Sequence, residues 1–421
     1  MAYNSTLRAS RRERHDSSPL MSARAAWSCY FKAIKKAKRD HWCAFLTTAT
    51  PQTVWTAKQF GIGRPPPRFP ELPRVSAPLE LNTALLEHFF PCSPVEVPHT
   101  ILLPFKDHLE LEAAEISRAL AHSSPSLAPG PDKTPNSVWK RIKKVAADLI
   151  LNLLAPLLHY GYHHPSLKKA YGIVLDKPGK PSYDSASSFR IIVLLQTFSK
   201  ILERIMNSRL SGVPKVTSLL NPHHCGSLAG LSVADACSTL THEIWTLQID
   251  KRKVCTLFLD IKGDFDKVNT SSLCSMLSAK GASPYLVSCT RSFLTGRSCC
   301  LLFQGSPKVF TPVSVGTPQG SPVSPLLFVI YVSGLNMEIP YGLTLSYVDD
   351  FALTVSSSSY RRNIHLLQRH YAILKAKGSC LGVGFSIPKT QLIHWRTSRD
   401  RAHPQQPLST TMDPCSAPRA S

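Results

Sequence analysis

Asp349 and Asp350 are adjacent aspartates inside an apolar stretch, residues 345–355 (L-S-Y-V-D-D-F-A-L-T-V). Apolar, strand-forming runs on both sides of two turn-tolerant residues predict a β-hairpin with the carboxylates at or beside its turn. Neighbouring carboxylates repel each other, and Mg²⁺, which prefers oxygen ligands, would offset that repulsion. For this pair taken alone, a solvated turn without a ligand is the simpler interpretation.

Asp260 supplies a third carboxylate and favours the metal interpretation. It ends a continuous apolar run, residues 254–259 (V-C-T-L-F-L), which predicts a buried strand that emerges at the edge of a sheet. If this strand lies beside the hairpin, Asp260 and Asp349 converge on one site. Acids around two metal ions about 4 Å apart can stabilise the attacking and leaving oxygens of a phosphoryl transfer. The three aspartates therefore predict nucleotidyl-transfer chemistry.

The elements that must position these acids carry recognisable end signals. Gly281 ends a predicted helix that begins at Thr270, and Ser283 followed by Pro284 begins the next one. Further helices are predicted at residues 22–49, 324–336 and 360–377, and strands at 189–195, 301–303 and 309–310.

Three motifs in order resemble those of reverse transcriptases. Residues 347–350 (Y-V-D-D) resemble the Y-x-D-D box, and residues 259–268 (L-D-I-K-G-D-F-D-K-V) resemble the first acidic motif of the same palm domain. Residues 316–328 are similar to the P-Q-G-S-P-x-S-P segment that contacts the incoming nucleotide and template. Residues 128–136 (A-P-G-P-D-K-T-P-N) resemble a segment typical of non-LTR (LINE-type) retrotransposon enzymes. The resemblance covers about residues 110–396.

This resemblance implies an α+β fold, with a palm formed by an antiparallel sheet packed on helices, a fingers region and a helical N-terminal extension. The implied domains are a basic, partly helical region with a proline-rich linker (1–75), the helical extension (76–165), the fingers (166–250), the palm (251–396) and a polar tail (397–421).

The resemblance also assigns roles to the acids and to one aromatic residue. Asp260, Asp349 and Asp350 would be catalytic and would ligate two Mg²⁺ ions, with Mn²⁺ as a possible substitute. Phe265 occupies the position of an aromatic ring under the sugar, where it would clash with a 2′-hydroxyl and select deoxynucleotides. A core phenylalanine without that role is the alternative for Phe265.

Further residues are implied to bind the nucleotide or the nucleic acid. Arg190 would bind nucleotide phosphate, since a guanidinium suits bidentate contacts with oxyanions; a structural ion pair with the palm is its alternative. Gln319 and Gly320 would approach the incoming base pair, and Lys389 would lie near the leaving pyrophosphate. The residues expected to contact nucleic acid are Lys177, Lys180 and Arg297.

The charge of the chain agrees with a polyanionic partner. Its 421 residues contain 49 Lys and Arg against 27 Asp and Glu, a formal net charge of +22. Such an excess favours phosphate contacts whose strength falls with salt. The resemblance implies an RNA template, a DNA primer and deoxynucleoside triphosphates as partners. The implied activity is an RNA-directed DNA polymerase, and the alternative is a catalytically inactive, nucleic-acid-binding remnant.

The sequence also bears on the setting of the protein. Apolar runs such as residues 326–332 are too short to span a membrane, so no membrane association is predicted. The twelve cysteines lack C-x-x-C spacing and indicate reduced thiols in an intracellular protein. Family resemblance implies that the protein is located in the nucleus and in a cytoplasmic ribonucleoprotein. The basic helix predicted at 22–49 is either an RNA-binding or nuclear-entry element or a solvated helix face.

Several positions depart from the family pattern. Asp264 replaces a small residue, Ile191 replaces proline, and Leu231 stands where arginine is usual. The chain shows no recognisable primer grip or thumb, which indicates a fragment of a larger element protein. The histidine pairs at 163–164 and 223–224 lack partners at metal-ligand spacing and are expected in loops or on the surface.

Overall fold

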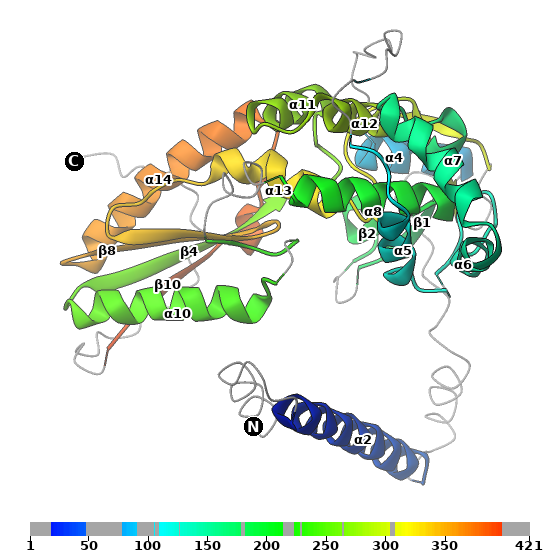
Figure 1. Ribbon diagram of the computed structural model, residues 1–421. Helices are drawn as coiled ribbons and strands as arrows, with labels where there is room; N and C mark the ends of the chain where they lie inside the picture. Colours follow the sequence, from blue (N-terminus) through cyan, green and yellow to red (C-terminus); the bar gives the residue numbers. More distant parts are fainter. Residues whose placement is uncertain are drawn as a thin grey trace. The chain divides into compact units, whose positions relative to one another are not determined.

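The computed structural model describes residues 18–47, 78–90, 105, 109–125, 127–177, 182–213, 223–227, 230–262, 265–303 and 308–397. The chain divides into two compact units, residues 1–68 and 69–421. In the first unit, helix α2 (Ser18–Thr47) confirms the helix predicted at 22–49 (Figure 1). The proline-rich linker, Lys180, Asp264 and the polar tail from residue 398 lie outside the described residues.

The larger sheet of the second unit contains β4, which carries Asp260 near its end, and β8, which begins at Asp350. Its order is β10-β4-β8-β7-β3, and β9 pairs with the end of β4. β4, β8, β7 and β10 pair antiparallel, whereas β3 is parallel to β7. The strands are β3 (His224–Cys225), β4 (Lys253–Lys262), β7 (Gly342–Tyr347), β8 (Asp350–Ser357), β9 (Gly384–Phe385) and β10 (Gln391–Trp395).

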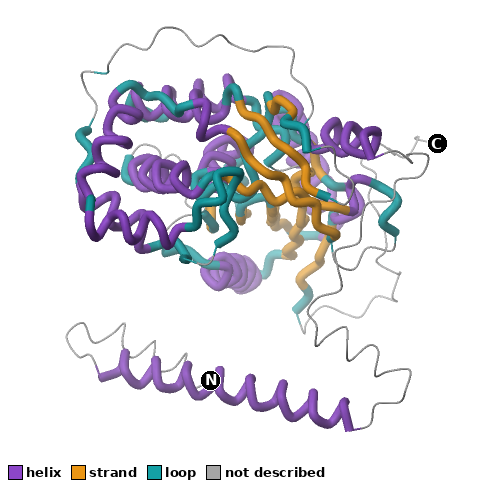
Figure 2. Tube along the Cα trace, turned by 90° about the vertical axis from the view of Figure 1, so that its right-hand side faces the viewer, coloured by secondary structure: helices purple, strands orange, loops and turns teal. Residues whose placement is uncertain are grey.

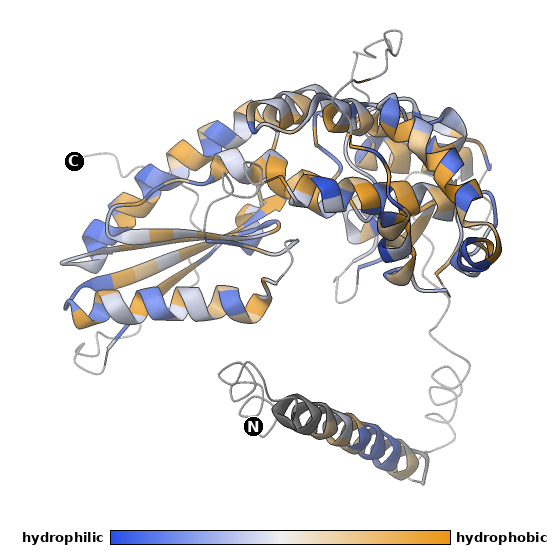
Figure 3. Ribbon diagram, in the orientation of Figure 1, coloured by the Kyte–Doolittle hydropathy of each residue, from blue (hydrophilic) through white to orange (hydrophobic). Residues whose placement is uncertain are grey.

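Helices α10 (Val233–Ile249) and α14 (Tyr360–Cys380) cover opposite faces of this sheet (Figure 1). Alternate side chains of a strand point to opposite faces. Leu257 packs in the main core with Leu367 of α14, whereas Phe258 packs with Ala236 of α10. Asp260, two residues after Phe258, therefore lies on the α10 side, where β4 leaves the sheet. Hydrophobic and hydrophilic residues alternate along both helices (Figure 3).

A second, four-stranded sheet has the order β2-β1-β5-β6. It consists of β1 (Lys169–Asp176), β2 (Phe189–Leu195), β5 (Arg297–Leu302) and β6 (Thr311–Val313). β1 is antiparallel to β2 and parallel to β5, so this sheet combines strands from the ranges predicted as fingers and as palm. Leu85 and Phe89 of α4 (Pro78–Phe89) pack against it. The strands predicted at 301–303 and 309–310 are displaced, because β5 and β6 pair Arg297 with Val313 and Cys299 with Thr311.

The remaining helices surround the main core, and the strands lie together among them (Figure 2). α13 is buried along almost its whole length, as expected for a helix without a polar face. α11 ends before Gly281, as predicted, and α12 begins at Pro284. The helices are α5 (Ala113–Ala121), α6 (Asn136–Val145), α7 (Ala147–His159), α8 (Thr197–Ser211), α11 (Thr270–Ala279), α12 (Pro284–Leu294) and α13 (Ser324–Val332). Short 3₁₀ turns are η1 (Pro165–Lys168), η2 (Ala186–Ser188), η3 (Ser333–Leu335) and η4 (Ile387–Lys389). No helix in the described ranges has the length and apolar character needed to cross a membrane.

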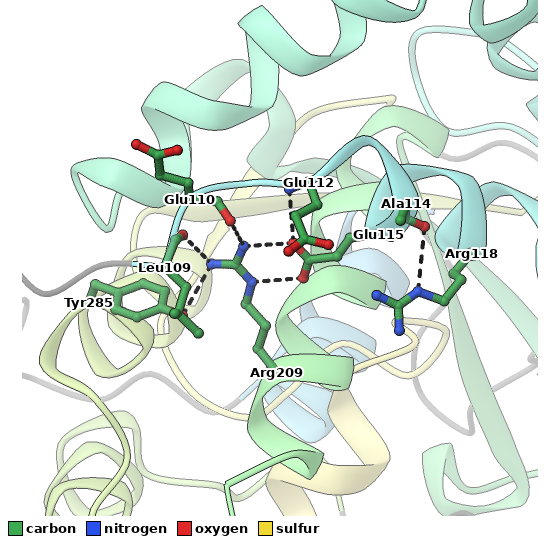
Figure 4. A network of polar contacts seen from close by, with 8 residues as sticks. All are labelled: Leu109, Glu110, Glu112, Ala114, Glu115, Arg118, Arg209 and Tyr285. Carbon is green, nitrogen blue, oxygen red and sulfur yellow. Dashed lines mark hydrogen bonds and ion pairs between the residues drawn. The ribbon is translucent and has the colours of Figure 1, made fainter.

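Arg209 of α8 ties the helical extension to the core (Figure 4). Its Nε and Nη2 donate to the two carboxylate oxygens of Glu115 at 2.9 and 2.8 Å. The same guanidinium donates to the carbonyl groups of Leu109 and Glu110 and to the hydroxyl of Tyr285 on α12. Because the pair is bidentate and every N–H group of the guanidinium has an acceptor, the side chain is held in one orientation. α5, α8 and α12 are therefore held together by one side chain.

Two of the four histidines expected in loops or on the surface are instead buried. His163 is 1% exposed and its Nε2 lies 3.0 Å from the Ser199 hydroxyl. His224 is 2% exposed in β3, with Nδ1 2.6 Å from the Ser346 hydroxyl. Burial lowers the pKa of His163 to about 3 and that of His224 to about 4. A neutral imidazole with a serine partner is readily buried. His163 lies in the loop before η1, within the prediction, whereas His224 lies in a strand, so the prediction was wrong for His224.

Candidate active site

The three predicted carboxylates meet at one end of the larger sheet. The antiparallel register of β4 and β8 places Asp260 directly opposite Asp350. Tyr347 pairs with Asp350 across the hairpin, so Val348 and Asp349 form the two-residue turn. Val348 has a positive φ of 57°, which two-residue hairpin turns require. The Ile261 N–H donates to the Asp349 carbonyl at 3.0 Å and ties this turn to β4.

The carboxylates interact electrostatically. Burial raises the pKa of Asp350, and the charges of Asp349 and Asp260 raise it further, while Lys389 lowers it. One oxygen of Asp260 accepts a hydrogen bond from the Lys389 ammonium group at 2.6 Å. Within the described ranges no three His, Cys, Asp or Glu side chains form a ready-made metal cluster. The donor set nevertheless suits a hard cation, because it consists of carboxylates that repel one another and already attract a positive group.

A cleft of about 600 Å³ opens beside Asp260. Its walls come from the end of β4, the start of β2, the segment before α13 and the η4 turn. Asp349, Asp350 and Gly320 do not line it. Six of the residues predicted from sequence do: Lys177, Arg190, Asp260, Phe265, Gln319 and Lys389.

Phe265 forms part of the cleft wall and joins it to the core. Its ring lies 5.2 Å from that of Phe328 on α13, at an interplanar angle of 40°. Its carbonyl accepts the Thr317 N–H at 2.6 Å, and the Gly316 N–H donates to Val268 at 2.9 Å. Gly316 has φ +79°, and a Cβ there would lie 2.7 Å from the Phe265 carbonyl oxygen. The two predicted motifs therefore meet through contacts that exclude a larger residue at position 316.

Gln319 and Gly320 lie against β2. The Gln319 carbonyl accepts the Val193 N–H at 2.7 Å. Gly320 has φ +131°, and a Cβ there would collide with the Val193 carbonyl oxygen, so this position needs glycine. This close approach of Gly320 is to the backbone of β2, which the sequence did not predict. The approach of Gln319 and Gly320 to a base pair stays a prediction.

The chain matches the family described as reverse transcriptase (RNA-dependent DNA polymerase) over residues 175–410, more than half of its 421 residues. It belongs to the reverse transcriptase family. Among relatives from Drosophila melanogaster, it is 27% identical to the probable RNA-directed DNA polymerase from transposon BS, over 67% of the chain and 31% of that protein. It is also 27% identical to the putative 115 kDa protein in type-1 retrotransposable element R1DM, over 90% of the chain and 37% of that protein.

These relatives identify the chain as a reverse transcriptase domain of the non-LTR retrotransposon type, as predicted. The chain spans about a third of the length of the relatives that it matches. A solved structure of apo telomerase from Candida tropicalis, truncated from the C-terminal domain, is 15% identical with a TM-score of 0.39, covering 63% of this chain and 57% of that one. The palm-like antiparallel sheet packed on helices confirms the predicted α+β fold.

Two basic residues predicted in this reverse transcriptase domain reach the cleft from the smaller sheet. Arg190 lies on β2, opposite Leu175 of β1, and is half-buried. Lys177 follows β1 and donates from Nζ to the Ser187 carbonyl at 3.0 Å. Both line the same cleft as Asp260 and the η4 turn. Their contact with phosphate stays a prediction.

Arg297 contradicts its predicted role in binding nucleic acid. Its side chain is buried, with 7% of the residue exposed. Nε donates to the Leu294 carbonyl at 2.9 Å, and Nη2 donates to the carbonyls of Val315 and Gly316. Burial lowers its pKa to about 10. Because these donors already hold backbone carbonyl groups, Arg297 is an internal brace between β5 and the segment that leads to Gln319.

The sequence interpretation missed other cleft residues of the reverse transcriptase site. Asp266 lines the cleft, and burial raises its pKa to about 6, against the opposing charges of Lys177 and Lys267. Ser386 also lines the cleft, and its N–H donates to the Asp260 carbonyl at 2.8 Å. An acid directly after Phe265 was a signal for Asp266, whereas nothing local to Ser386 indicated its place.

Proposed function

We propose that this chain is the catalytic core of an RNA-directed DNA polymerase of a non-LTR retrotransposon, which adds deoxynucleotides to a primer 3′-hydroxyl. The observation that carries the proposal is the β4–β8 register, which sets Asp260 opposite Asp350 beside a cleft of about 600 Å³. The cleft is large enough for a nucleotide. The family match and the names of the relatives support the same activity.

The proposed cofactor is a pair of Mg²⁺ ions, with Mn²⁺ as a substitute, held by Asp260, Asp349 and Asp350. When bound, two such ions lower the pKa of the attacking hydroxyl and stabilise the leaving pyrophosphate. Asp260, whose carboxylate holds the Lys389 ammonium group at 2.6 Å, would hold the ions through the same carboxylate. Lys389 then remains in the same cleft, where its positive charge stabilises the pyrophosphate.

The other walls of the cleft bind and select the nucleotide in this proposal. Arg190 and Lys177 bind phosphate oxygens from the side of the smaller sheet. The Phe265 ring lies under the sugar and excludes a 2′-hydroxyl. Gln319 supports the base pair with the RNA template. The formal charge of +22 favours binding to the phosphate backbones of the template and the primer. The proposed locations, the nucleus and a cytoplasmic ribonucleoprotein, follow from the family resemblance.

A non-catalytic, nucleic-acid-binding role is the second candidate. One observation favours it: among the described residues the acids are not assembled as a three-ligand cluster, and Lys389 is bound to Asp260. In that case the basic surface would bind nucleic acid and the acids would carry out no chemistry.

Primer extension on poly(rA)/oligo(dT) with Mg²⁺ distinguishes the two functions. We expect the wild-type chain to extend the primer and Asp349→Ala to lose extension. The exposed Asp250, which ends α10 away from these acids, provides the matched control Asp250→Ala. Fluorescence anisotropy with the same duplex measures binding separately. Wild-type extension no greater than that of Asp349→Ala, with binding intact, would reject the polymerase in favour of the binding role.

A further inference from the structure

Glu203 of α8 is a completely buried carboxyl group that lies outside the cleft. The Ser199 hydroxyl donates to its Oε1 at 2.6 Å, and the Ser321 hydroxyl donates to its Oε2 at 2.5 Å. Within the described part of the chain no cation lies within ion-pair distance of it. Burial raises its pKa, while the two serine hydrogen bonds and the charges of Lys200 and Arg204 lower it. A buried carboxyl held only by hydroxyl groups stabilises a fold poorly, which suggests another use.

Ser321 belongs to the segment from Gly316 to Val323, which carries Gln319 to the cleft. Backbone hydrogen bonds attach the start of this segment to the end of the first acidic motif and its middle to β2. The Ser321 side chain attaches its last part, since the Ser321 oxygen also accepts the Val323 N–H at 3.3 Å. Glu203 is thus the side-chain anchor of the last part of this segment, whereas the Arg297 guanidinium holds the Gly316 carbonyl at its start and backbone groups hold its middle.

The position of α8 in the chain links the Glu203–Ser321 hydrogen bond to Arg190. α8 directly follows β2, which carries Arg190 and whose Val193 N–H donates to the Gln319 carbonyl. Glu203 and Arg190 therefore belong to one strand–helix unit, and the bond to Ser321 fixes that unit against the segment bearing Gln319. Arg190 and Gln319 are on the cleft wall together.

We propose that Glu203 is a positioning residue for nucleotide binding: through Ser321 it holds Gln319 at a fixed position relative to Arg190. The inference rests on the proposed polymerase function. Glu203 does not touch the nucleotide; it limits the relative movement of two groups that do. Placement of binding groups to within a fraction of an ångström governs how much of their binding energy is realised.

The other oxygen of Glu203 provides an internal control. The Ser199 hydroxyl lies 3.0 Å from the His163 ring nitrogen Nε2. The backbone N–H of His163 donates to the Ser292 hydroxyl on α12 at 2.8 Å. This arm leads into the core and away from the cleft. Ser199→Ala and Ser321→Ala each remove one serine hydroxyl from the same carboxyl, but only Ser321→Ala releases the segment that bears Gln319.

The test measures the KM for deoxynucleotide, kcat and the melting temperature of each variant in the full chain. We expect Ser321→Ala to raise KM about tenfold, the effect of one hydrogen bond to a charged group, with a smaller change in kcat. Glu203→Gln, which has one acceptor oxygen instead of two, should also raise KM, and Glu203→Gln/Ser321→Ala should raise it no further than Ser321→Ala. Ser199→Ala should lower the melting temperature and leave KM unchanged.

Amide hydrogen exchange at Val193 provides a second readout that needs no catalysis. Ser321→Ala and Glu203→Gln should accelerate exchange at this amide, and Ser199→Ala should not. Equal effects of the two serine variants, or wild-type KM and exchange in Ser321→Ala, would overturn the positioning role. Failure of the wild-type chain to extend a primer would instead reject the polymerase, while Val193 exchange would still decide whether Glu203 holds the segment.

Discussion

Two ion pairs in this chain use charge in opposite ways. Arg209 and Glu115 form a bidentate pair with side chains 6% and 13% exposed, and further hydrogen bonds occupy the guanidinium. Lys389 contacts Asp260 at 2.6 Å; the aspartate side chain is 16% exposed, but the lysine side chain is 62% exposed, so the pair differs from the first in its cation. The first pair joins three helices of the core, and the second lies on the wall of an open cleft.

The difference in exposure indicates which of the two ion pairs can exchange its cation for another one. Removing one partner of a buried pair leaves an uncompensated charge and costs about 3–5 kcal/mol, whereas exposed pairs contribute about 0–1 kcal/mol. The Arg209–Glu115 pair is therefore structural. The Lys389–Asp260 pair costs little to open, so Asp260 can accept another cation without loss of the fold.

The strongest test of this comparison is Asp260→Asn. We expect primer extension to fall on the order of 10³-fold or more, equivalent to about 4 kcal/mol, because the proposed metal ligand Asp260 is lost. The melting temperature should stay the same, since the pair with Lys389 is open to solvent. Single-turnover extension and thermal melting measure the two effects. Normal extension by Asp260→Asn would contradict the site, and a large fall in melting temperature would show that the pair is structural.

Arg209→Leu should show the converse behaviour. We expect the free energy of unfolding to fall by about 3–5 kcal/mol, because Glu115 is left buried without its partner. Urea denaturation measures the change. Arg209→Leu/Glu115→Leu is the matched control and should recover part of the loss, since it leaves no unpaired charge. A midpoint equal to that of the wild-type chain would mean that this pair does not hold the three helices.

Phe265→Val should change selectivity and not stability alone. The smaller side chain removes the proposed clash with a 2′-hydroxyl, so discrimination against ribonucleotides should fall about tenfold or more. The ratio of kcat/KM for a deoxynucleotide to that for its ribonucleotide measures this effect. Phe265→Tyr keeps the ring and should keep the discrimination. If Phe265→Val retained the wild-type ratio, Phe265 would be a core residue that packs on Phe328 and nothing more.

Lys389→Ala should have the smallest effect on folding. The free energy of unfolding should change by less than about 0.5 kcal/mol, as for exposed charged residues in general. Extension should decrease about tenfold if Lys389 stabilises the pyrophosphate. Urea denaturation and steady-state extension provide the two values. A loss of stability as large as that of Arg209→Leu would remove the distinction between the two ion pairs.

Much of the site could be predicted because its signals are local. The run before Asp260 predicts a buried strand, the two apolar runs around Asp349 predict a hairpin, and the register then places Asp260 opposite Asp350. Gly320, whose positive φ requires glycine, also belongs to a recognisable motif at residues 316–328. These features depend on residues close together in the chain, where periodicity and turn chemistry are visible.

Arg297 and Glu203 show where that reasoning stops. Both are charged residues, a type that is rarely buried without a partner, yet both are buried. The partners of Arg297 include carbonyl groups 18 and 19 residues away, and Ser321 is 118 residues from Glu203. A polar side chain is buried when folding brings it a hydrogen-bond partner, and that partner is unknown until distant segments meet.

Neighbouring residues encode the family motifs, the acids and the strands that carry them, so these features are visible in the sequence. The long-range contacts of the fold show that Arg297 is an internal brace, that Lys389 reaches Asp260 across 129 residues and that Glu203 anchors the segment bearing Gln319. The physical reason is that burial and hydrogen bonding belong to pairs of groups, and these pairs form between parts of the chain that are remote in sequence.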